Sequence, residues 1–166
     1  MGYNQVGDLR LSVAIFAAGC FWGVESTFQS LNGVVNTDVG YIGGDKENPT
    51  YEEVCYSRTG HAESVRVEFD PSIITYEELL DCFWNLHDPT TLNRQGPDIG
   101  EQYRSAIFFS NEEEEELAKR SREKWDNSGK FSDPIVTEIT KATIFWLGEE
   151  YHQSYFFKRG ITGGCH

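Results

Sequence analysis

The spacing of apolar residues along the chain predicts short strands that alternate with short helices. Residues 11–18 form a mostly apolar run that stops at Gly19, which is typical of a buried strand. Residues 64–69 alternate between apolar and charged side chains, so we expect one face of this strand to be buried. Further strands are expected at residues 34–41, 104–109 and 135–140.

Four segments carry the signals of helices. Residues 21–31 end at Asn32-Gly33, a pair that commonly stops a helix. Each of the other three begins with Ser or Thr followed three residues later by Glu, the pattern of a capping box. The pairs are Thr50–Glu53, Thr75–Glu78 and Ser110–Glu113. In the last helix the acidic run 112–116 precedes the basic residues, which complements the helix dipole and favours a solvated face over an acidic binding patch.

The order of these elements lacks the regular rhythm of a doubly wound sheet. We therefore expect an α+β domain, a compact two-layer sandwich of a mixed sheet with packed helices and a coil-rich C-terminal tail. The length of 166 residues suggests a single domain. We place a loose leader at residues 1–10, one catalytic domain at 11–157 and a flexible glycine-rich tail at 158–166.

The charge balance restricts the partners of the chain. Lys and Arg number 14 and Asp and Glu number 27, which gives a formal net charge of −13. This acidity argues against a nucleic-acid surface and against a polybasic membrane patch. No apolar run approaches the roughly 18 residues of a spanning helix, and residues 11–20 resemble a lipoprotein leader only loosely. We expect a cytoplasmic monomer without nucleic-acid or membrane partners.

The cysteines suggest a reduced protein with one or two working thiols. They lie at positions 20, 55, 82 and 165, too sparse for a disulfide framework and without the Cys-x-x-Cys pair of a structural zinc site. Cys82 lies on the apolar stripe of the helix after Thr75 and is expected in the core. Because the common phosphate-binding glycine motifs are also absent, we expect no metal and no bound cofactor.

Cys20 is the strongest candidate for a nucleophile. It lies at the expected junction between a strand and a helix, within the segment GCFWG at residues 19–23. The positive end of a helix dipole lowers the pKa of a thiol and favours the thiolate. Phe21 and Trp22 can line an apolar pocket beside it. The alternative is an inert buried cysteine among core aromatic residues.

Glu63 is a candidate acid, because it precedes the alternating strand in the segment GHAE at residues 60–63. A carboxyl near apolar walls has a raised pKa and can act as a general acid. The neighbouring His61 is a candidate base, or a turn residue without a catalytic role. Local sequence alone leaves Glu63 open to the same plain interpretation as a surface residue of a turn.

A long polar loop at residues 92–100 supplies further candidates. Long ordered loops in compact domains are often functional. Asp98 lies in this loop and Tyr103 follows it, and a tyrosine hydroxyl can donate to a developing oxyanion. Turn chemistry for Asp98 and core packing for Tyr103 are equally open, and the same ambiguity applies to Tyr51.

Seven ordered segments resemble those of the A-type peptide methionine sulfoxide reductases. They are GCFWG at 19–23, GYIGG at 40–44, NPTYEEVC at 48–55, GHAE at 60–63, FWNLHDPT at 83–90, NRQGPD at 93–98 and EEYHQ at 149–153. Their order across most of the chain makes chance agreement negligible. The resemblance implies an α+β fold and reduction of the S epimer of methionine sulfoxide, free or in proteins.

The resemblance also implies roles for single residues. Cys20 matches the nucleophile that attacks the sulfoxide sulfur and becomes a sulfenic acid. Glu63 matches the acid that protonates or hydrogen-bonds the sulfoxide oxygen, with Tyr51 and Tyr103 as further donors. Phe21 and Trp22 match the pocket for the S-methyl group, and Asp98 matches a residue that helps to bind substrate through water.

The C-terminal tail departs from the commoner pattern of the family, in which a Gly-Tyr-Cys segment is followed by a second tail cysteine. Here residues 158–166 contain only Cys165, among several glycines. We expect Cys165 to be the resolving thiol and thioredoxin to reduce the resulting disulfide. Cys55 is the second candidate for the resolving thiol. If neither acts, an external thiol such as thioredoxin or dithiothreitol recycles the enzyme directly.

Two other functions remain compatible with the residues themselves. The first is a hydrolase in which Cys20 works with His61 or His152. The second is a binding module that captures peptides containing oxidised methionine without turnover.

Overall fold

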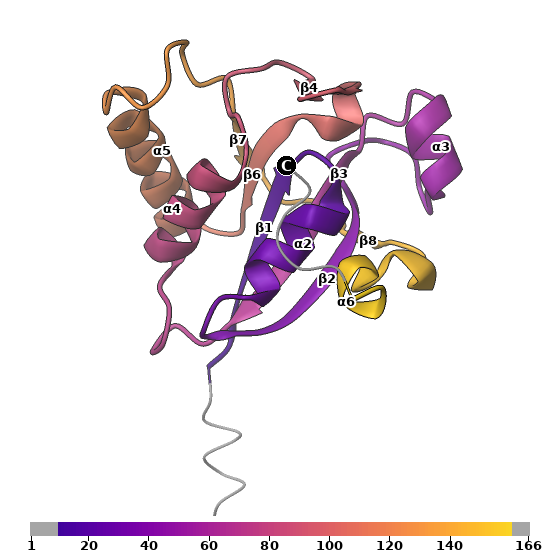
Figure 1. Cartoon of the computed structure of the whole chain (residues 1–166), viewed down its shortest axis with the longest axis horizontal. Coiled ribbons are helices and arrows are strands. Elements are labelled where there is room, and N and C mark those ends of the chain that lie inside the picture. The colour runs from indigo at the N-terminus through magenta and orange to yellow at the C-terminus, as the bar shows by residue number, and fades with distance from the viewer. Residues whose placement is uncertain (1–9, 161–166) are drawn as a thin grey trace, which may run out of the picture.

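The computed structural model describes residues 10–160, which fold around a six-stranded sheet in the order β7-β6-β1-β3-β2-β8 (Figure 1). Neighbouring strands are antiparallel except for β6 and β7, which are parallel, so the sheet is mixed. The strands are β1 (Ser12–Ala18), β2 (Val34–Ile42), β3 (Ala62–Phe69), β6 (Ser105–Phe109), β7 (Glu138–Lys141) and β8 (Trp146–Leu147).

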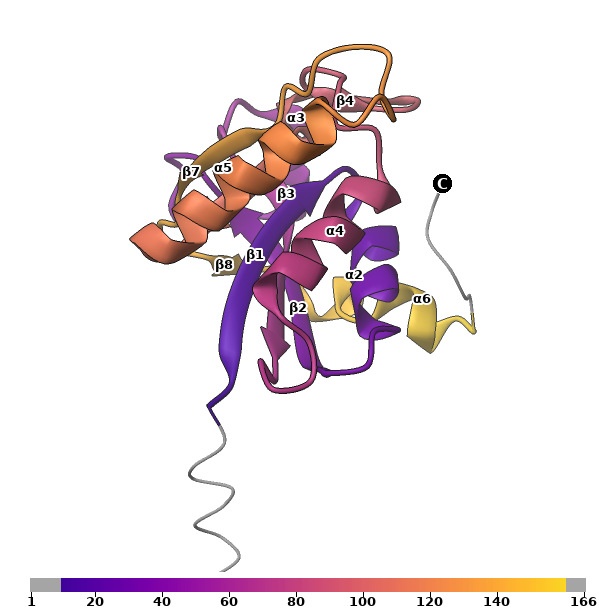
Figure 2. The ribbon, with the colours of Figure 1, turned by 90° about the vertical axis from the view of Figure 1, so that its left-hand side faces the viewer.

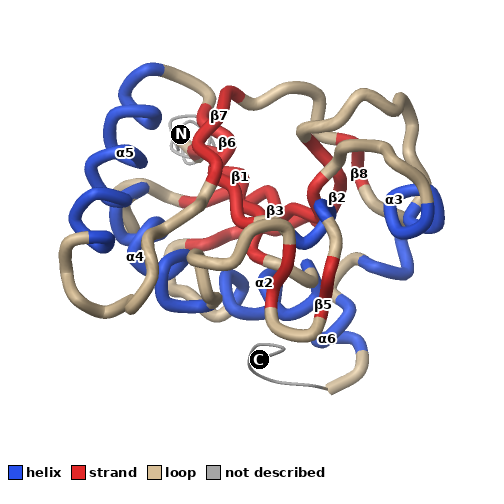
Figure 3. The backbone as a smooth tube through the Cα atoms, turned by 90° about the horizontal axis from the view of Figure 1, so that it is seen from above, coloured by secondary structure: helices blue, strands red, loops and turns tan. Residues whose placement is uncertain are grey.

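Three helices cover one face of the sheet: α2 (Phe21–Gln29), α4 (Tyr76–Leu86) and α5 (Glu112–Asp126) (Figures 2 and 3). The main core lies between them and the sheet, and Phe16 of β1 is stacked between Phe28 of α2 and Phe83 of α4, each ring centroid 5.2 Å away. The alternating strand β3 points its apolar side chains into this core, as its sequence predicted.

The opposite face of the sheet carries a smaller apolar cluster instead of a helical layer. Ala142 and Phe145, in the segment that leads to β8, pack over it. The remaining short helices lie beyond the β2 and β8 end of the sheet: α3 (Tyr51–Tyr56) and α6 (Tyr155–Lys158) (Figure 1). The expected α+β fold with a mixed sheet and packed helices is therefore confirmed.

Two of the three expected capping boxes are present. Thr50 caps α3 and Thr75 caps α4, each with the reciprocal bond from the glutamate three residues later. The box at Ser110 and Glu113 is wrong by one residue. Asn111 caps α5 by accepting from the N–H of Glu114, whose carboxylate reaches back to the N–H of Ser110. Asn has the preferred side chain for this position, so it displaces the neighbouring serine.

Two other regions, one expected to be a loop and one a strand, differ from the expectation. The polar loop at 92–100 contains a small hairpin of β4 (Arg94–Gln95) and β5 (Asp98–Ile99). The strand expected from residue 135 begins only at Glu138. The preceding backbone is engaged elsewhere, because the N–H of Ile135 donates to Asp126 and that of Val136 donates to the carbonyl of Pro89.

Most of the expected leader and the tail segment with Cys165 lie outside the described residues. Between residues 10 and 160, no helix has the length and apolar character needed to cross a bilayer.

Candidate active site

Cys20 occupies the turn between β1 and α2. Gly19 adopts a positive φ of 96°, which favours glycine, and a Cβ there would lie 2.8 Å from Cγ of Gln95. Cys20 itself is the N-cap residue of α2 and is half-buried. The thiol therefore lies at the positive end of the helix, as the sequence predicted, where a thiolate is stabilised.

Glu63 lies directly beside this turn. It is the second residue of β3 and only 1% exposed, and its Oε1 accepts a hydrogen bond of 3.3 Å from the N–H of Phe21. Its cross-strand partner in β2 is Tyr41. The carboxyl group expected at a strand mouth is thus buried at the N-terminus of α2, where it is hydrogen-bonded to the residue that follows Cys20.

Tyr51 and Tyr103 bring two hydroxyl groups to the same region. Tyr51 begins α3, and Tyr103 ends a 3₁₀ helix, η1 (Glu101–Tyr103). Burial raises the pKa of both phenols, and the nearby Glu63 charge raises each further. Both tyrosines are therefore neutral hydrogen-bond donors near Glu63. The charges of Asp98 and Cys20 also raise the pKa of Tyr103, so both groups lie in its surroundings.

Aromatic rings form a wall behind the thiol. The indole of Trp22 stacks on Tyr155 with a centroid distance of 3.8 Å, and its Nε1–H donates to Nδ1 of His152 at 2.9 Å. The His152 ring in turn packs against Tyr51 at 4.3 Å and Phe21 at 5.2 Å. Phe21 and Trp22 are thereby fixed beside Cys20, as a pocket for a small apolar group requires.

Neither histidine proposed for a hydrolase has a lone pair available as a base. Nδ1 of His152 accepts from Trp22, so in the neutral ring Nε2 carries the proton. Burial lowers the pKa of His152, which favours this neutral form. Nδ1 of His61 accepts from the N–H of Gly44, while its Nε2 donates to the carbonyl of Lys46. His61 thus holds the loop after β2 in place.

The other described cysteines show two environments. Cys55 lies one helical turn after Tyr51 on α3 and is hydrogen-bonded to it; burial raises the pKa of this thiol. Cys82 packs against the main core, as expected, and burial raises its pKa to about 11. Within residues 10–160, no group of three or more His, Cys, Asp or Glu side chains is placed to hold a metal ion.

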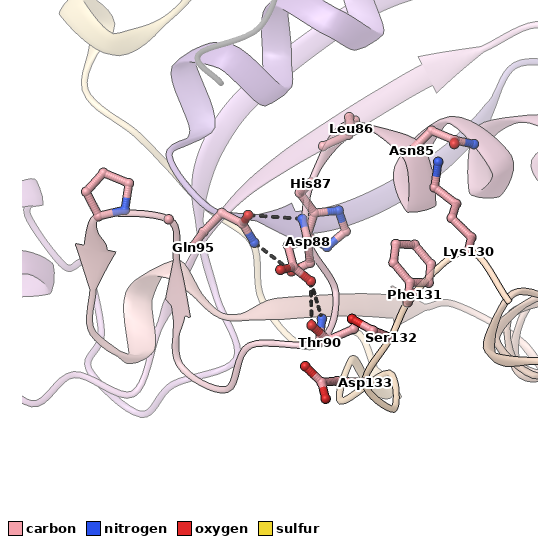
Figure 4. A pocket seen from close by; sticks show the side chains of 12 residues that line it. Asn85, Leu86, His87, Asp88, Thr90, Gln95, Lys130, Phe131, Ser132 and Asp133 are labelled. Atoms are coloured by element: carbon pink, nitrogen blue, oxygen red, sulfur yellow. Dashed lines mark hydrogen bonds between the residues drawn. The ribbon is translucent and has the colours of Figure 1, made fainter.

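A cavity of about 630 Å³ lies next to this site but does not contain it. It lies between the end of α4, the β4–β5 hairpin and residues 130–133 (Figure 4). Its boundary with the Cys20 turn is Gln95, whose side chain packs against Gly19 and whose amide bonds both backbone groups of Asp88. The side chains suited to catalysis lie around Cys20 instead: Glu63, Tyr51 and Tyr103.

Sequence reasoning missed several members of the site. Glu149 binds Tyr51 and Tyr41, and Tyr155 stacks on Trp22. His152 serves as an acceptor for Trp22 rather than as a base. The signals available were the segment EEYHQ at 149–153 and the aromatic stretch after it. Neither shows which partner each side chain finds more than 90 residues away.

The fold and the site together define an α+β thiol enzyme with a cysteine at a helix N-terminus beside a buried carboxyl group. The chain belongs to the peptide methionine sulfoxide reductase family, whose sequence profile matches residues 12–166. It is accordingly an oxidoreductase that reduces methionine sulfoxide in a thiol-dependent reaction.

Individual relatives agree in sequence and structure. The peptide methionine sulfoxide reductase MsrA of Methanoculleus marisnigri is 61% identical over 158 residues, which cover 95% of this chain and 96% of that protein. The crystal structure of reduced Mxr1 from Saccharomyces cerevisiae has a TM-score of 0.86 and 36% identity, covering 94% of this chain and 90% of its own. The crystal structure of Mxr1 in complex with Trx2 has a TM-score of 0.62 and 28% identity, and the match covers 88% of this chain and 85% of that chain.

Proposed function

We propose that this chain reduces the S epimer of methionine sulfoxide, free or in proteins, through a sulfenic acid on Cys20. The observation that carries the proposal is the position of Glu63, which is buried at the N-terminus of α2 and hydrogen-bonded to the N–H of the residue that follows Cys20. An enzyme that repairs oxidised proteins needs a nucleophile for the sulfoxide sulfur and an acid for its oxygen, and this arrangement supplies both.

The reaction begins when the Cys20 thiolate attacks the sulfoxide sulfur. Glu63 protonates or hydrogen-bonds the oxygen, because an unprotonated sulfoxide oxygen is a poor leaving group. The oxygen then passes to Cys20, so that methionine leaves reduced by two electrons and Cys20 is oxidised to the sulfenic acid. Burial of Glu63 supports the role of an acid, since a low-dielectric environment disfavours the carboxylate.

The surrounding residues select and orient the substrate. Tyr51 and Tyr103 donate to the sulfoxide oxygen, while Phe21 and Trp22 enclose the methyl group. Asp98 helps to bind substrate through water. One apolar pocket for methyl and one set of donors for oxygen suffice to distinguish the two epimers, because the other epimer exchanges these groups. The raised pKa values of both tyrosines support their role as neutral donors.

The sulfenic acid is then resolved by Cys165 with loss of water, and thioredoxin reduces the disulfide. The solved complex of Mxr1 with Trx2 supports a thioredoxin as partner. Cys55 is the alternative resolving thiol. We propose that the enzyme works as a cytoplasmic monomer without a bound cofactor.

Intact-protein mass spectrometry after one turnover with a methyl sulfoxide substrate, in the absence of reductant, tests this scheme. Wild type should lose two hydrogens, whereas Cys165→Ser should retain a sulfenic acid that a dimedone reagent traps at Cys20. A persistent sulfenic acid in wild type would transfer recycling to an external thiol. No oxidation at Cys20 in either protein would refute Cys20 as the nucleophile.

A further inference from the structure

Glu149 connects two elements of the active site that are distant in sequence. Its Oε1 accepts from the hydroxyl of Tyr41 at 2.7 Å, and its Oε2 accepts from the backbone N–H of Tyr51 at 2.8 Å. Tyr41 is fully buried in β2, directly opposite Glu63 in β3. Tyr51 is the first residue of α3. The carboxylate thus ties the start of α3 to the strand that pairs with Glu63.

The bond to Tyr51 supplies what the helix itself cannot. The first N–H groups of a helix have no partner within it. The capping box of α3 satisfies the N–H of Glu53 through Thr50, and the N–H of Tyr51 donates instead to Glu149. Because α3 spans only six residues, a single external anchor at its first residue has a large effect on where it lies.

The charge of Glu149 strengthens both bonds. Burial, the largest single cause, raises the pKa of this carboxyl, but the bonds from Tyr51 and Tyr41, a backbone bond of Glu149 itself and the charge of His152 together lower it overall. Glu149 is therefore ionised at neutral pH, and hydrogen bonds to an ionised acceptor are shorter and stronger than neutral ones. The observed distances are in the range expected for such bonds.

Glu149 also fixes the side chain of Tyr51 from a second direction. The backbone carbonyl of Glu149 accepts from the N–H of His152, and the His152 ring packs on Tyr51 at 4.3 Å. One residue therefore sets both the backbone position of Tyr51 and the location of the ring beside it.

We propose that Glu149 is a positioning residue for sulfoxide reduction, acting through Tyr51, an inference that rests on the proposed role of Tyr51 as a donor to the sulfoxide oxygen. Glu149 itself does not touch the substrate. Its carboxylate holds the Tyr51 hydroxyl where the oxygen of the bound sulfoxide develops charge. Tyr103 provides a second donor, so the contribution of Glu149 becomes fully visible only when Tyr103 is removed.

The test measures the rate of sulfenic-acid formation in single turnovers at saturating methyl sulfoxide. Glu149→Gln keeps the size of the side chain but removes its charge and leaves a single acceptor oxygen for the two donors, so neither hydrogen bond is charge-assisted any longer. We expect a fall of about tenfold in the Tyr103→Phe background, a smaller fall in wild type and none beyond twofold in the Tyr51→Phe background. This coupling to Tyr51 is a signature that general loosening of the fold does not produce.

Glu150→Gln is the matched control, because Glu150 is the next residue and its exposed side chain forms an ion pair with Lys158 at 3.4 Å, away from Tyr41 and the N–H of Tyr51. It should leave the rate unchanged in all three backgrounds. If Glu149→Gln does not fold, Tyr41→Phe removes the other partner of the carboxylate and should show the same pattern with a smaller amplitude.

Three results would overturn the inference. The first is that Glu149→Gln lowers the rate as much in the Tyr51→Phe background as in the Tyr103→Phe background. The second is that Glu149→Gln leaves the rate of the Tyr103→Phe variant unchanged. The third is that Tyr51→Phe has no effect on the rate, either in wild type or in the Tyr103→Phe background. Failure of the proposed function itself looks different, because wild type then fails to form the Cys20 sulfenic acid at all.

Discussion

At the scale of single residues, Glu63 experiences two opposing influences. The N-terminus of α2 favours its carboxylate form, whereas its burial favours the neutral acid. The hydrogen bond from the N–H of Phe21 is 3.3 Å, longer than a strong bond of this type. A thiolate at Cys20 opposes a second negative charge still further. This balance is what a proton donor beside a nucleophile requires.

Glu63→Gln should therefore keep the fold and substrate binding but slow sulfenic-acid formation. The amide preserves the acceptor for Phe21 yet has no acidic proton, and loss of a general acid costs about 100-fold or more in rate. Single-turnover quench experiments measure this rate, with the thermal transition as the control for folding. A rate close to wild type would exclude Glu63 as the acid.

His152→Phe should weaken substrate binding rather than the chemical step. The ring is retained, but the Nε1–H of Trp22 loses its acceptor, so the wall of the methyl pocket is no longer held in one orientation. We expect KM to rise by about tenfold, since an unsatisfied donor costs about 1–3 kcal/mol. Steady-state kinetics with dithiothreitol measure the change.

His152→Asn provides the rescue, because its side-chain oxygen lies close to the position of Nδ1 and can accept from the indole. It should recover part of the lost affinity. An unchanged KM in His152→Phe, in a protein with a normal thermal transition, would show that the hydrogen bond does not orient Trp22.

At the scale of elements, the structure assigns the N-cap of α5 to Asn111, whereas the sequence pattern assigns it to Ser110. Asn111→Ala removes the side chain that accepts from Glu114 and should lower the free energy of unfolding by about 1 kcal/mol. Ser110→Ala should cost much less, because only the backbone N–H of Ser110 takes part in this cap. Urea denaturation of both variants measures the difference, and equal losses would contradict the assignment.

Elements with a strong local signal could be predicted from the sequence. Strands β1 and β3, the caps at Thr50 and Thr75, and the junction at Cys20 all follow from apolar spacing and nearby polar residues. The start of β7 could not, since it depends on where distant groups bind the backbone of Ile135 and Val136. The hairpin in the polar loop could not be predicted for a different reason, because strands of only two residues are too short to show an alternating pattern.

The same distinction applies to the site. Cys20 and Glu63 lie in segments that resemble a known family, and the structure places them next to each other. Glu149 lies in such a segment too, but its role depends on Tyr41 and Tyr51, about 100 residues earlier. A sequence segment shows that a residue is present, whereas the contacts that give it a role arise only when the chain folds.

At the scale of the whole molecule, residues 148–155 pack on α2 and β2 and complete the surroundings of Cys20. The side chain of Gln153 bonds both backbone groups of Val39 and the carbonyl of Gly148. Ser154, in a left-handed conformation with φ 52°, donates its N–H to Glu25. These bonds place His152 and Tyr155 against Trp22. The stability of this docking is therefore linked to the orientation of Trp22 beside Cys20.

Glu25 gives this docking a pH dependence. It is 1% exposed and accepts from the hydroxyl of Thr37 and the N–H of Ser154, each at 2.8 Å. Burial is the main cause of its raised pKa, which those two bonds and the charge of Lys158 partly offset and the charge of Asp38 increases. The folded protein thus holds the proton of Glu25 to a higher pH than the unfolded chain does.

Glu25→Gln should therefore become more stable relative to wild type as pH rises. In wild type, deprotonation favours the unfolded chain above its ordinary pKa of 4.5, and this cost is complete once the pH exceeds the raised folded value. Glutamine stays neutral, so the difference in unfolding free energy should increase in its favour as the pH rises from the ordinary pKa of 4.5 through the raised pKa of the folded protein. Urea denaturation of both proteins across this range measures it. A flat or opposite trend for Glu25→Gln would show that Glu25 is not the titrating group of the docked segment.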